Sequence, residues 1–300
     1  MNSLSARSTC AEPPKAERAL PFLKWVGGKR ASAATIIDVL PERIRRYFEP
    51  MLGGGAVFFA LKAQERITVS SILSDVNEEL MGTFAIVKDE VEPLILELAK
   101  LRYDRAEYEA WRKLDPWMLE GVQTAARMIY LNRTGFNGVY RVNRAGKFNV
   151  PFGRYTNPII CNAEGLRAAS RALQGAHLEC VSCFKLLEPS ASPLLPLPMP
   201  GDAVYLDPPY APISKTANFT AYDAAKFTVK DQERLAAQFD ELARRGVAVA
   251  LSNSSAALID ELYHGYHIRP MQVRRNVNSK ASQRGPVSEV LITANCRGDA

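Results

Sequence analysis

Long apolar runs are missing from this chain of 300 residues. No stretch approaches the ~20 consecutive apolar residues that a membrane-spanning helix needs, so we expect no membrane span. Apolar residues make up 47% and charged residues 23%, as is usual for globular proteins. Residues 1–17 are polar and lack the apolar core of a signal peptide, so we expect a disordered tail there.

Clusters of metal-ligating residues are also missing. The five cysteines are scattered, and Cys180 and Cys183 are the only closely spaced pair. No second pair or histidine cluster completes a zinc site, and the three histidines suggest neither a metal nor a catalytic triad. The pattern predicts reduced thiols, a cytoplasmic location and no bound metal.

Acidic residues are absent between Glu120 and Glu164, although the chain as a whole has a net charge of only +6. This stretch carries the basic residues Arg127, Arg133, Arg141, Arg144, Lys147 and Arg154. Phosphates would relieve the repulsion between such charges, and their counterions would be released on binding. The aromatic residues Phe136, Tyr140, Phe148, Phe152 and Tyr155 interleave with them. The pattern favours a nucleic-acid-binding segment, and the alternative is a solvated basic face.

The first part of the chain alternates between strand and helix patterns. It predicts a helix over about 32–40, a strand near 46–48, a helix over 56–63 and a strand over 67–73. Glycines 53–55 form the turn before the second helix, and Asp75 follows the second strand. This order is typical of a nucleotide-binding α/β sheet.

The remaining pattern divides the chain further. Residues 78–131 are predicted to be helical throughout, and a segment rich in Gly, Asn and Arg follows at 132–157. Strands are predicted at 177–181, 203–206 and 247–251, a helix at 229–245 and a proline-rich surface loop at 188–201. We therefore expect residues 18–78 and 165–300 to form a sheet domain, and residues 79–164 to form an inserted helical domain.

The tetrapeptide Asp207-Pro208-Pro209-Tyr210 directly follows a predicted strand. Ligands of open α/β sheets bind beyond the carboxyl ends of strands, and consecutive prolines hold the chain extended there. Asp207 and the Pro208 carbonyl can accept both hydrogens of an exocyclic amine such as adenine N6, while Tyr210 can stack on a base. Related tetrapeptides act on RNA and on protein amides, and an ordinary turn is a further alternative.

The glycine turn suits a ligand that approaches the backbone closely, because a helix with free N–H groups follows it. Neither this turn nor Gly28-Lys29-Arg30 completes a phosphate-loop pattern. Asp75 lies 20 residues past Gly55 and can hold ribose hydroxyls. Its alternative role is to cap a helix that starts at residue 77 or 78.

Together these motifs resemble the Dam family of DNA adenine-N6 methyltransferases, the GATC-type enzymes of the D12 class. The resemblance covers residues 21 to about 294 and is strongest in residues 21–29, 130–138, 148–155 and 217–222. It implies a Rossmann-like, S-adenosylmethionine-dependent methyltransferase sheet of the α/β class, with an inserted, mostly helical target-recognition domain. It further implies a nucleoid-associated monomer that acts on double-stranded DNA by base flipping.

The resemblance also implies roles for individual residues. The catalytic set is Asp207, Pro208 and Tyr210, and the set that binds S-adenosylmethionine is Trp25, Lys29, Glu49, Gly53, Gly55, Asp75 and Asp207. For DNA, Lys24 would read the first guanine of GATC and Arg141 the guanine opposite the last cytosine. Other expected DNA contacts are Val139 and Pro151 on the thymine methyl, Phe136 in the base stack, Asn137 at the orphaned thymine, and Arg133, Asn143, Asn149 and Arg154 on phosphates.

One position departs from the family pattern. Where the family has an acid at the end of a strand, this chain has Ser182, followed by Cys183 and Phe184. A serine can still hydrogen-bond the adenine of the cofactor. Two alternatives remain open: methylation of adenine in RNA or in another sequence, and a DNA-binding homologue with weakened catalysis.

Overall fold

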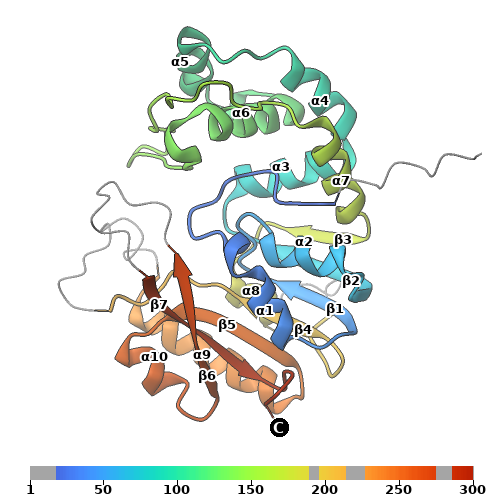
Figure 1. Cartoon of the computed structure of the whole chain (residues 1–300), viewed down its shortest axis with the longest axis vertical. Coiled ribbons are helices and arrows are strands. Elements are labelled where there is room, and N and C mark those ends of the chain that lie inside the picture. Colours follow the sequence, from blue (N-terminus) through green and yellow to red (C-terminus); the bar gives the residue numbers. More distant parts are fainter. Residues whose placement is uncertain (1–17, 189–195, 214–226, 275–285, 300) are drawn as a thin grey trace, which may run out of the picture.

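The computed structural model describes residues 18–188, 196–213, 227–274 and 286–299 (Figure 1). The expected tail at 1–17 and the family-like segment 217–222 lie outside these ranges. The strands are β1 Ile44–Glu49, β2 Ile67–Ser74, β3 Ala176–Glu179, β4 Ala203–Leu206, β5 Ala248–Ser254, β6 His267–Arg274 and β7 Pro286–Ala294. The helices are α1 Ala33–Val39, α2 Ala56–Ala63, α3 Glu78–Asp89, α4 Val91–Ala99, α5 Arg105–Lys113, α6 Gly121–Thr134, α7 Ala163–Leu173, α8 Cys183–Leu187, α9 Val229–Arg244 and α10 Ala257–Leu262. Short 3₁₀ helices occur at η1 Lys29–Ala31, η2 Pro116–Met118 and η3 Phe136–Gly138.

A seven-stranded sheet forms the centre of the molecule, with the order β3-β2-β1-β4-β5-β7-β6. The pairs from β3 to β5 are parallel, whereas β7 runs antiparallel to both β5 and β6. This arrangement confirms the expected Rossmann-like α/β class. Figure 1 shows α4, α5 and α6 grouped at one end of the molecule, away from the sheet.

Alternate residues of the central strands face two separate apolar cores. On one face, Tyr47 of β1 and Tyr205 of β4 pack toward α1, α2 and α3. On the other face, Phe48 and Val204 pack toward α8, α9 and α10. Because both faces are covered, all of β4 and the first four residues of β5 are apolar, as in other parallel sheets.

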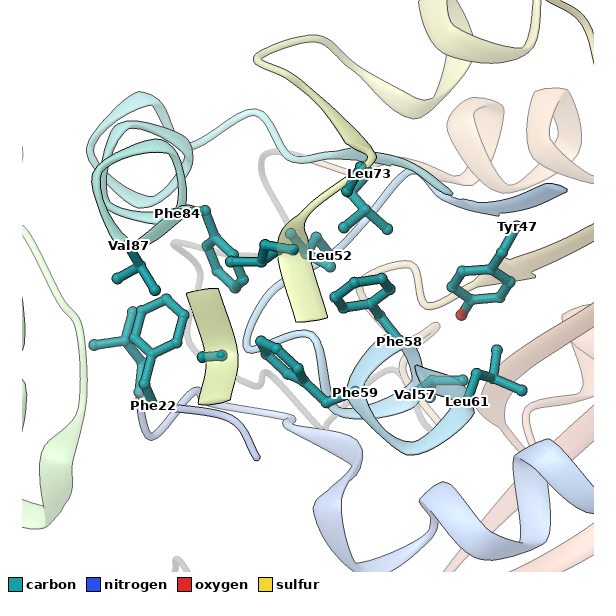
Figure 2. Packing of buried hydrophobic residues seen from close by; sticks show 14 of the residues in the cluster. Phe22, Tyr47, Leu52, Val57, Phe58, Phe59, Leu61, Leu73, Phe84 and Val87 are labelled. Atoms are coloured by element: carbon teal, nitrogen blue, oxygen red, sulfur yellow. The ribbon is translucent and has the colours of Figure 1, made fainter. Parts of the chain in front are cut away.

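Aromatic rings fill the core on the α2 side (Figure 2). The ring centroids of Phe22 and Phe84 are 4.8 Å apart, and those of Phe58 and Phe59 are 5.1 Å apart. Phe84 belongs to α3, so this helix shares the core of the sheet. The expected boundary between residues 78 and 79 falls in the first turn of α3, and the one between 164 and 165 falls in the first turn of α7.

Most predicted elements are confirmed, and the exceptions have physical causes. The helix at 56–63 and the strand at 203–206 match to the residue. The prediction of continuous helix over 78–131 is wrong, since the chain turns at Glu90, at Leu101–Asp104 and before η2. The described part of the proline-rich loop, residues 196–200, contains no helix or strand. The pattern did not reveal β6 and β7, whose pairing depends on distant parts of the chain.

Candidate active site

The expected cofactor and catalytic residues gather at one edge of the sheet. From β1 the strand order runs to β2 and β3 on one side, and from β4 it runs to β5 on the other. Ligands of open α/β sheets bind at such a reversal, beyond the carboxyl ends of the strands. Glu49 ends β1 and the glycine turn follows it, Asp75 comes directly after β2, and Asp207 comes directly after β4.

Two donors hold the Asp207 carboxylate. Lys29 Nζ lies 2.6 Å from Oδ2, and Ser252 Oγ donates to Oδ1 at 2.8 Å. Lys29 Nζ also donates to the Gly27 carbonyl, which keeps its ammonium group in place. Each carboxylate oxygen keeps a further lone pair, so the fixed group can still accept hydrogen bonds from a substrate.

Ser252 is supported in turn by Tyr205. The Tyr205 hydroxyl and Ser252 Oγ are 2.8 Å apart, and both side chains are buried between β4 and β5. Because Ser252 gives its own proton to Asp207, the tyrosine acts as the donor to the serine. The buried hydroxyl groups of Tyr205 and Ser252 thus orient the carboxylate of Asp207.

The backbone after Asp207 is clamped by buried amide and hydroxyl groups. Gln232 Nε2 donates to the Pro209 carbonyl at 2.8 Å, and Asn253 Oδ1 accepts from the Ala211 N–H at 3.0 Å. Ser254 Oγ donates to the Ala211 carbonyl, so both polar groups of Ala211 are bonded. Within the described residues, no hydrogen bond reaches the Pro208 carbonyl. That carbonyl is therefore available to a substrate amine.

Tyr210 is held at its hydroxyl. The hydroxyl donates to Glu289 Oε2 of β7 at 2.9 Å, and Lys29 Nζ lies 5.0 Å from the centre of the ring. Burial raises the pKa of Tyr210, and the nearby charges of Asp207 and Glu289 add to this effect. The phenol therefore stays neutral near pH 7 and presents an oriented ring.

Glu49 is the last residue of β1 and is almost completely buried. Burial raises the pKa of its carboxyl to about 8 and the charge of Asp207 adds to the rise, although hydrogen bonds from the Tyr47 hydroxyl and the Phe58 N–H oppose it. Glu49 is thus a buried acid that titrates near neutral pH at the end of β1.

Asp75 connects the two loops that follow β1 and β2. Its Oδ2 accepts from the Gly53 N–H at 3.0 Å, and its Oδ1 accepts from the Asn77 N–H at 3.0 Å. Burial raises the pKa of Asp75. The alternative that Asp75 caps the next helix is wrong, because the cap of α3 is Asn77, whose side chain accepts from the Leu80 N–H.

A side chain of the protein itself approaches Gly53 closely, so the position requires glycine even without a ligand. Its φ is +49°, and a Cβ at this position would lie 2.8 Å from Cδ1 of the Trp25 indole. The same indole stacks on Tyr140, with ring centroids 5.5 Å apart. Trp25 therefore lies between the glycine turn and the expected recognition segment.

Asn132 holds Lys24 against that segment. Its buried amide accepts from the Lys24 N–H and donates to the carbonyls of Lys24 and Gly138, at distances of 2.8–2.9 Å. A Cβ on Gly138 would lie 2.4 Å from Lys24 Cδ, so only glycine fits beside the lysine chain. The Lys24 ammonium lies 5.0 Å from the centre of the Tyr155 ring.

The expected DNA-contacting residues lie mainly on exposed loops. A tight turn brings Arg141 and Asn149 together, and Arg141 Nε donates to Asn149 Oδ1 at 2.7 Å. Asn143 Oδ1 accepts from the backbone N–H groups of Ala145 and Lys147 and so shapes this turn. Exposed side chains are Lys24, Phe136, Asn137, Arg141, Asn143, Pro151 and Arg154, whereas Arg133, Val139 and Asn149 are half-buried.

Two parts of the basic-segment interpretation are wrong. Arg127 does not face solvent, because it is buried and pairs with Glu79 at 2.7 Å. Most of the interleaved aromatic rings do not face solvent either: Phe148 is buried and packs with Tyr108 and Tyr130, while Tyr140 and Phe152 pack against this cluster. Phe136 is the exposed exception, with half of its side-chain surface accessible.

Ser182 lies beyond the carboxyl end of β3, next to the edge that carries the other cofactor candidates. Its Oγ caps α8 by accepting from the Lys185 N–H at 3.3 Å. The hydroxyl proton remains available to a ligand. Within the described residues, no cluster of His, Cys, Asp or Glu could hold a metal ion, and no helix there has the length and hydropathy of a membrane span.

Sequence reasoning missed the residues that support Asp207 and its loop: Tyr205, Gln232, Ser252, Asn253, Ser254 and Glu289. One signal was available. The strand predicted at 247–251 is followed by Ser252-Asn253-Ser254, a polar run at a carboxyl end. All three side chains are buried, and buried polar side chains form hydrogen bonds, here with the loop that follows β4.

A Rossmann-like sheet that carries Asp-Pro-Pro-Tyr at its switch point defines a methyltransferase. The family model of the D12 class N6 adenine-specific DNA methyltransferases matches residues 25–277, and this chain belongs to that family. A type II methyltransferase of Lactococcus lactis subsp. cremoris is 37% identical over 91% of this chain and 94% of its own length. The DNA adenine methylase of Escherichia coli K12 is 35% identical over 90% of this chain and 93% of its own length.

Proposed function

We propose that this enzyme methylates adenine N6 within GATC in duplex DNA, with S-adenosylmethionine as the methyl donor. The observation that carries the proposal is the Asp207 carboxylate, held by Lys29 and Ser252 next to the Pro208 carbonyl, to which no group among the described residues donates a hydrogen bond. Family membership supports adenine as the target base. One relative is named a DNA adenine methylase, whereas others are named type II methyltransferases, so the GATC target is the finer part of the proposal.

The residues at the sheet edge fit S-adenosylmethionine. Asp75 keeps lone pairs for ribose hydroxyls. The N–H groups of Gly53 and Gly55 are donated to Asp75 and Leu52, so the first N–H groups of α2 are the backbone donors offered to the cofactor. Glu49, Trp25 and Lys29 complete the proposed cofactor set, together with Asp207. The bound cofactor would supply a methyl group on a sulfonium, and its sulfur would leave as a neutral thioether when the nitrogen lone pair attacks the methyl carbon.

The protein's part in the reaction is to orient the amine. Asp207 and the Pro208 carbonyl would accept the two N6 hydrogens, which turns the nitrogen lone pair out of the ring and toward the methyl donor. Tyr210 would stack on the base, a contact worth about 1–3 kcal/mol. Most of the rate enhancement would come from holding the adenine amine and the methyl donor in the correct relative position. No strong general base is needed, since the proton leaves after nitrogen becomes cationic.

Access to adenine in a duplex requires base flipping, which costs a few kcal/mol of unstacking. The exposed Phe136 supports this step, because an aromatic ring can fill the vacated stack. Lys24 and Arg141 are the proposed readers of guanine, with Val139 and Pro151 at the thymine methyl and Asn137 at the orphaned thymine. Arg133, Asn143, Asn149 and Arg154 are the proposed phosphate contacts.

The domain division is also a proposal. We assign target recognition to the segment from α4 through residue 161 and the chemistry to the sheet with α3. Leu80 and Phe84 of α3 pack in the core of the sheet, and Leu94 of α4 and Ile129 of α6 belong to the same core, so a continuous apolar core joins the two proposed parts. Tyr108, Tyr130, Leu131, Phe148 and Val150 form a smaller core of their own within the recognition segment.

Expression in a host that lacks adenine methylation tests the proposal. Its DNA is digested with one endonuclease that cuts only methylated GATC and another that cuts only unmethylated GATC. We expect cutting by the first and protection from the second, with both effects lost in Asp207→Ala. Methyl incorporation into structured RNA instead of duplex DNA would reject the DNA assignment, and unchanged digests would reject GATC.

A further inference from the structure

Three arginines line one cavity beside the proposed recognition segment. Arg18 lies at the start of the described chain, Arg30 belongs to η1, and Arg133 lies in the last turn of α6. The cavity has a volume of about 140 Å³, and Asn162 and Gly165 at the start of α7 also line it. Three arginines from separate parts of the chain thus line the same cavity.

These charges have no acidic partner within the described ranges. Arg133 is half-buried and donates from Nη2 to the Phe22 carbonyl at 2.8 Å, which occupies one of its five N–H groups. Burial, and then the charge of Arg30, lower the pKa of Arg133. Glu164, which directly precedes Gly165 of the cavity lining, pairs instead with Arg167. The charges repel one another, and the N-terminus of α7 adds positive potential.

An anion with several oxygens would satisfy this arrangement. Guanidinium groups bind phosphate oxygens through paired N–H donors, and such charge-assisted bonds are stronger than neutral ones. The charge of Arg133 also reaches Lys24, whose pKa is lowered first by burial and then by this charge. The cavity therefore neighbours a proposed base-reading lysine.

We propose that Arg18, Arg30 and Arg133 together bind one phosphate of the DNA backbone. The proposal rests on the proposed function and extends it, because Arg133 is the only one of these three arginines to which the resemblance assigned a phosphate contact. A phosphate contact positions the duplex and carries no direct base information. The pocket would thus strengthen binding to any duplex and help to set the orientation in which Lys24 meets its base.

The dependence of DNA affinity on salt tests the proposal. Each neutralised phosphate adds roughly 0.9 to the slope of log affinity against log salt concentration. In Arg18→Gln/Arg30→Gln we expect the slope to fall by about one, with equal weakening for duplexes with and without GATC. Both side chains are exposed, so these substitutions leave the apolar cores intact, which thermal denaturation can verify.

A matched variant controls for total charge. Arg43→Gln/Arg171→Gln removes two exposed arginines, one before β1 and one in the last turn of α7. Charges remote from the duplex are screened over about 10 Å at 0.1 M salt, so this variant should keep most of the wild-type slope. Equal slopes in the two double variants would overturn the proposal.

Two further measurements separate the remaining outcomes. Inorganic phosphate is compared with chloride at equal ionic strength for its effect on thermal stability. If phosphate stabilises the wild type but not Arg18→Gln/Arg30→Gln, and the DNA slope is unchanged, the pocket binds free phosphate and the DNA assignment is overturned. Wild-type methylation of duplex DNA is measured in parallel: its absence would reject the proposed function, whereas normal methylation with an unchanged slope rejects only the pocket.

Discussion

At the scale of single residues, the two partners of Asp207 contribute in different ways. Lys29 provides a positive charge, so its loss would alter both the charge and the position of the carboxylate. Ser252 is neutral and buried, and it bonds Oδ1 of Asp207 without adding a charge. We therefore regard Ser252 as a positioning residue, whose contribution can be separated from electrostatics.

Replacing Ser252 tests this role. In Ser252→Ala we expect kcat to fall by about tenfold to a hundredfold, because small misplacements of reacting groups are costly. KM for DNA should change little, and Ser252→Thr should restore activity through its hydroxyl. Leaving the Tyr205 hydroxyl unpaired should cost about 1–3 kcal/mol of stability. As a control, Ser170→Ala removes a buried serine in α7 that bonds the Lys88 carbonyl. Wild-type kcat in Ser252→Ala would contradict the role.

Gly53 offers a second test among single residues. In Gly53→Ala we expect weaker binding of S-adenosylmethionine and a loss of about 1–2 kcal/mol of stability, from the positive φ and the clash with Trp25. Titration calorimetry and thermal denaturation measure both effects. Gly82→Ala is the matched control, since nothing lies within 4 Å of its added Cβ in α3. It should stabilise the helix by up to about 1 kcal/mol. Equal behaviour of the two variants would contradict the proposed fit.

At the scale of elements, residues 22–29 link the recognition segment to the catalytic turn. Lys24 is bonded to Asn132, Trp25 lies between Tyr140 and Gly53, and Lys29 bonds Asp207. A short stretch of chain thus touches both parts of the proposed site. A change in how residues 22–29 pack against α6 should therefore alter which DNA sequence is methylated.

Asn132→Ala tests that link. The substitution leaves the backbone N–H and C=O of Lys24 and the Gly138 carbonyl without their side-chain partner. We expect the preference for GATC over a site with the first guanine replaced to fall by about tenfold, since one base contact is worth about 1–3 kcal/mol. Affinity for S-adenosylmethionine should be retained. Comparing kcat/KM on the two duplexes measures the effect, and undiminished preference would show that Asn132 does not position Lys24.

At the scale of the whole molecule, Glu49 makes stability depend on pH. The pKa of its carboxyl is raised from an ordinary value of 4.5 to about 8 in the folded protein. Between these values the folded protein holds more protons than the unfolded chain, so the free energy of unfolding falls as pH rises. The contribution is complete below about 4.5 and is lost as pH rises through the folded pKa.

Glu49→Gln should remove this dependence. We expect wild-type stability to fall by up to about 1.4 kcal/mol per pH unit between pH 5 and 8 from this group, whereas the amide variant loses less. Urea denaturation at several pH values in this range measures the difference. Glu261→Gln, which replaces an exposed acid of α10, serves as the control. Parallel stability profiles for wild type and Glu49→Gln would show that burial does not shift the pKa of this carboxyl.

The sequence alone determined the elements nearest the chemistry and the expected family. The helix at 56–63, the strand at 203–206 and the tetrapeptide after it follow from local periodicity and proline geometry, which depend on adjacent residues. The carboxyl-end position of Asp75 and Asp207 follows from the same pattern. The polar run Ser252-Asn253-Ser254 can be read from the sequence, but nothing in the sequence indicates which loop its side chains bond.

Only the tertiary structure decided which distant side chains meet. Lys29 and Asp207 are 178 positions apart, and their contact requires η1 to lie beside the loop that follows β4. The same holds for Ser252, which reaches Asp207 across the register of β4 and β5. It also holds for Arg127, which proved to be a buried partner of Glu79. Periodicity reports burial along one element, whereas hydrogen bonds and ion pairs between elements depend on strand order, register and helix packing.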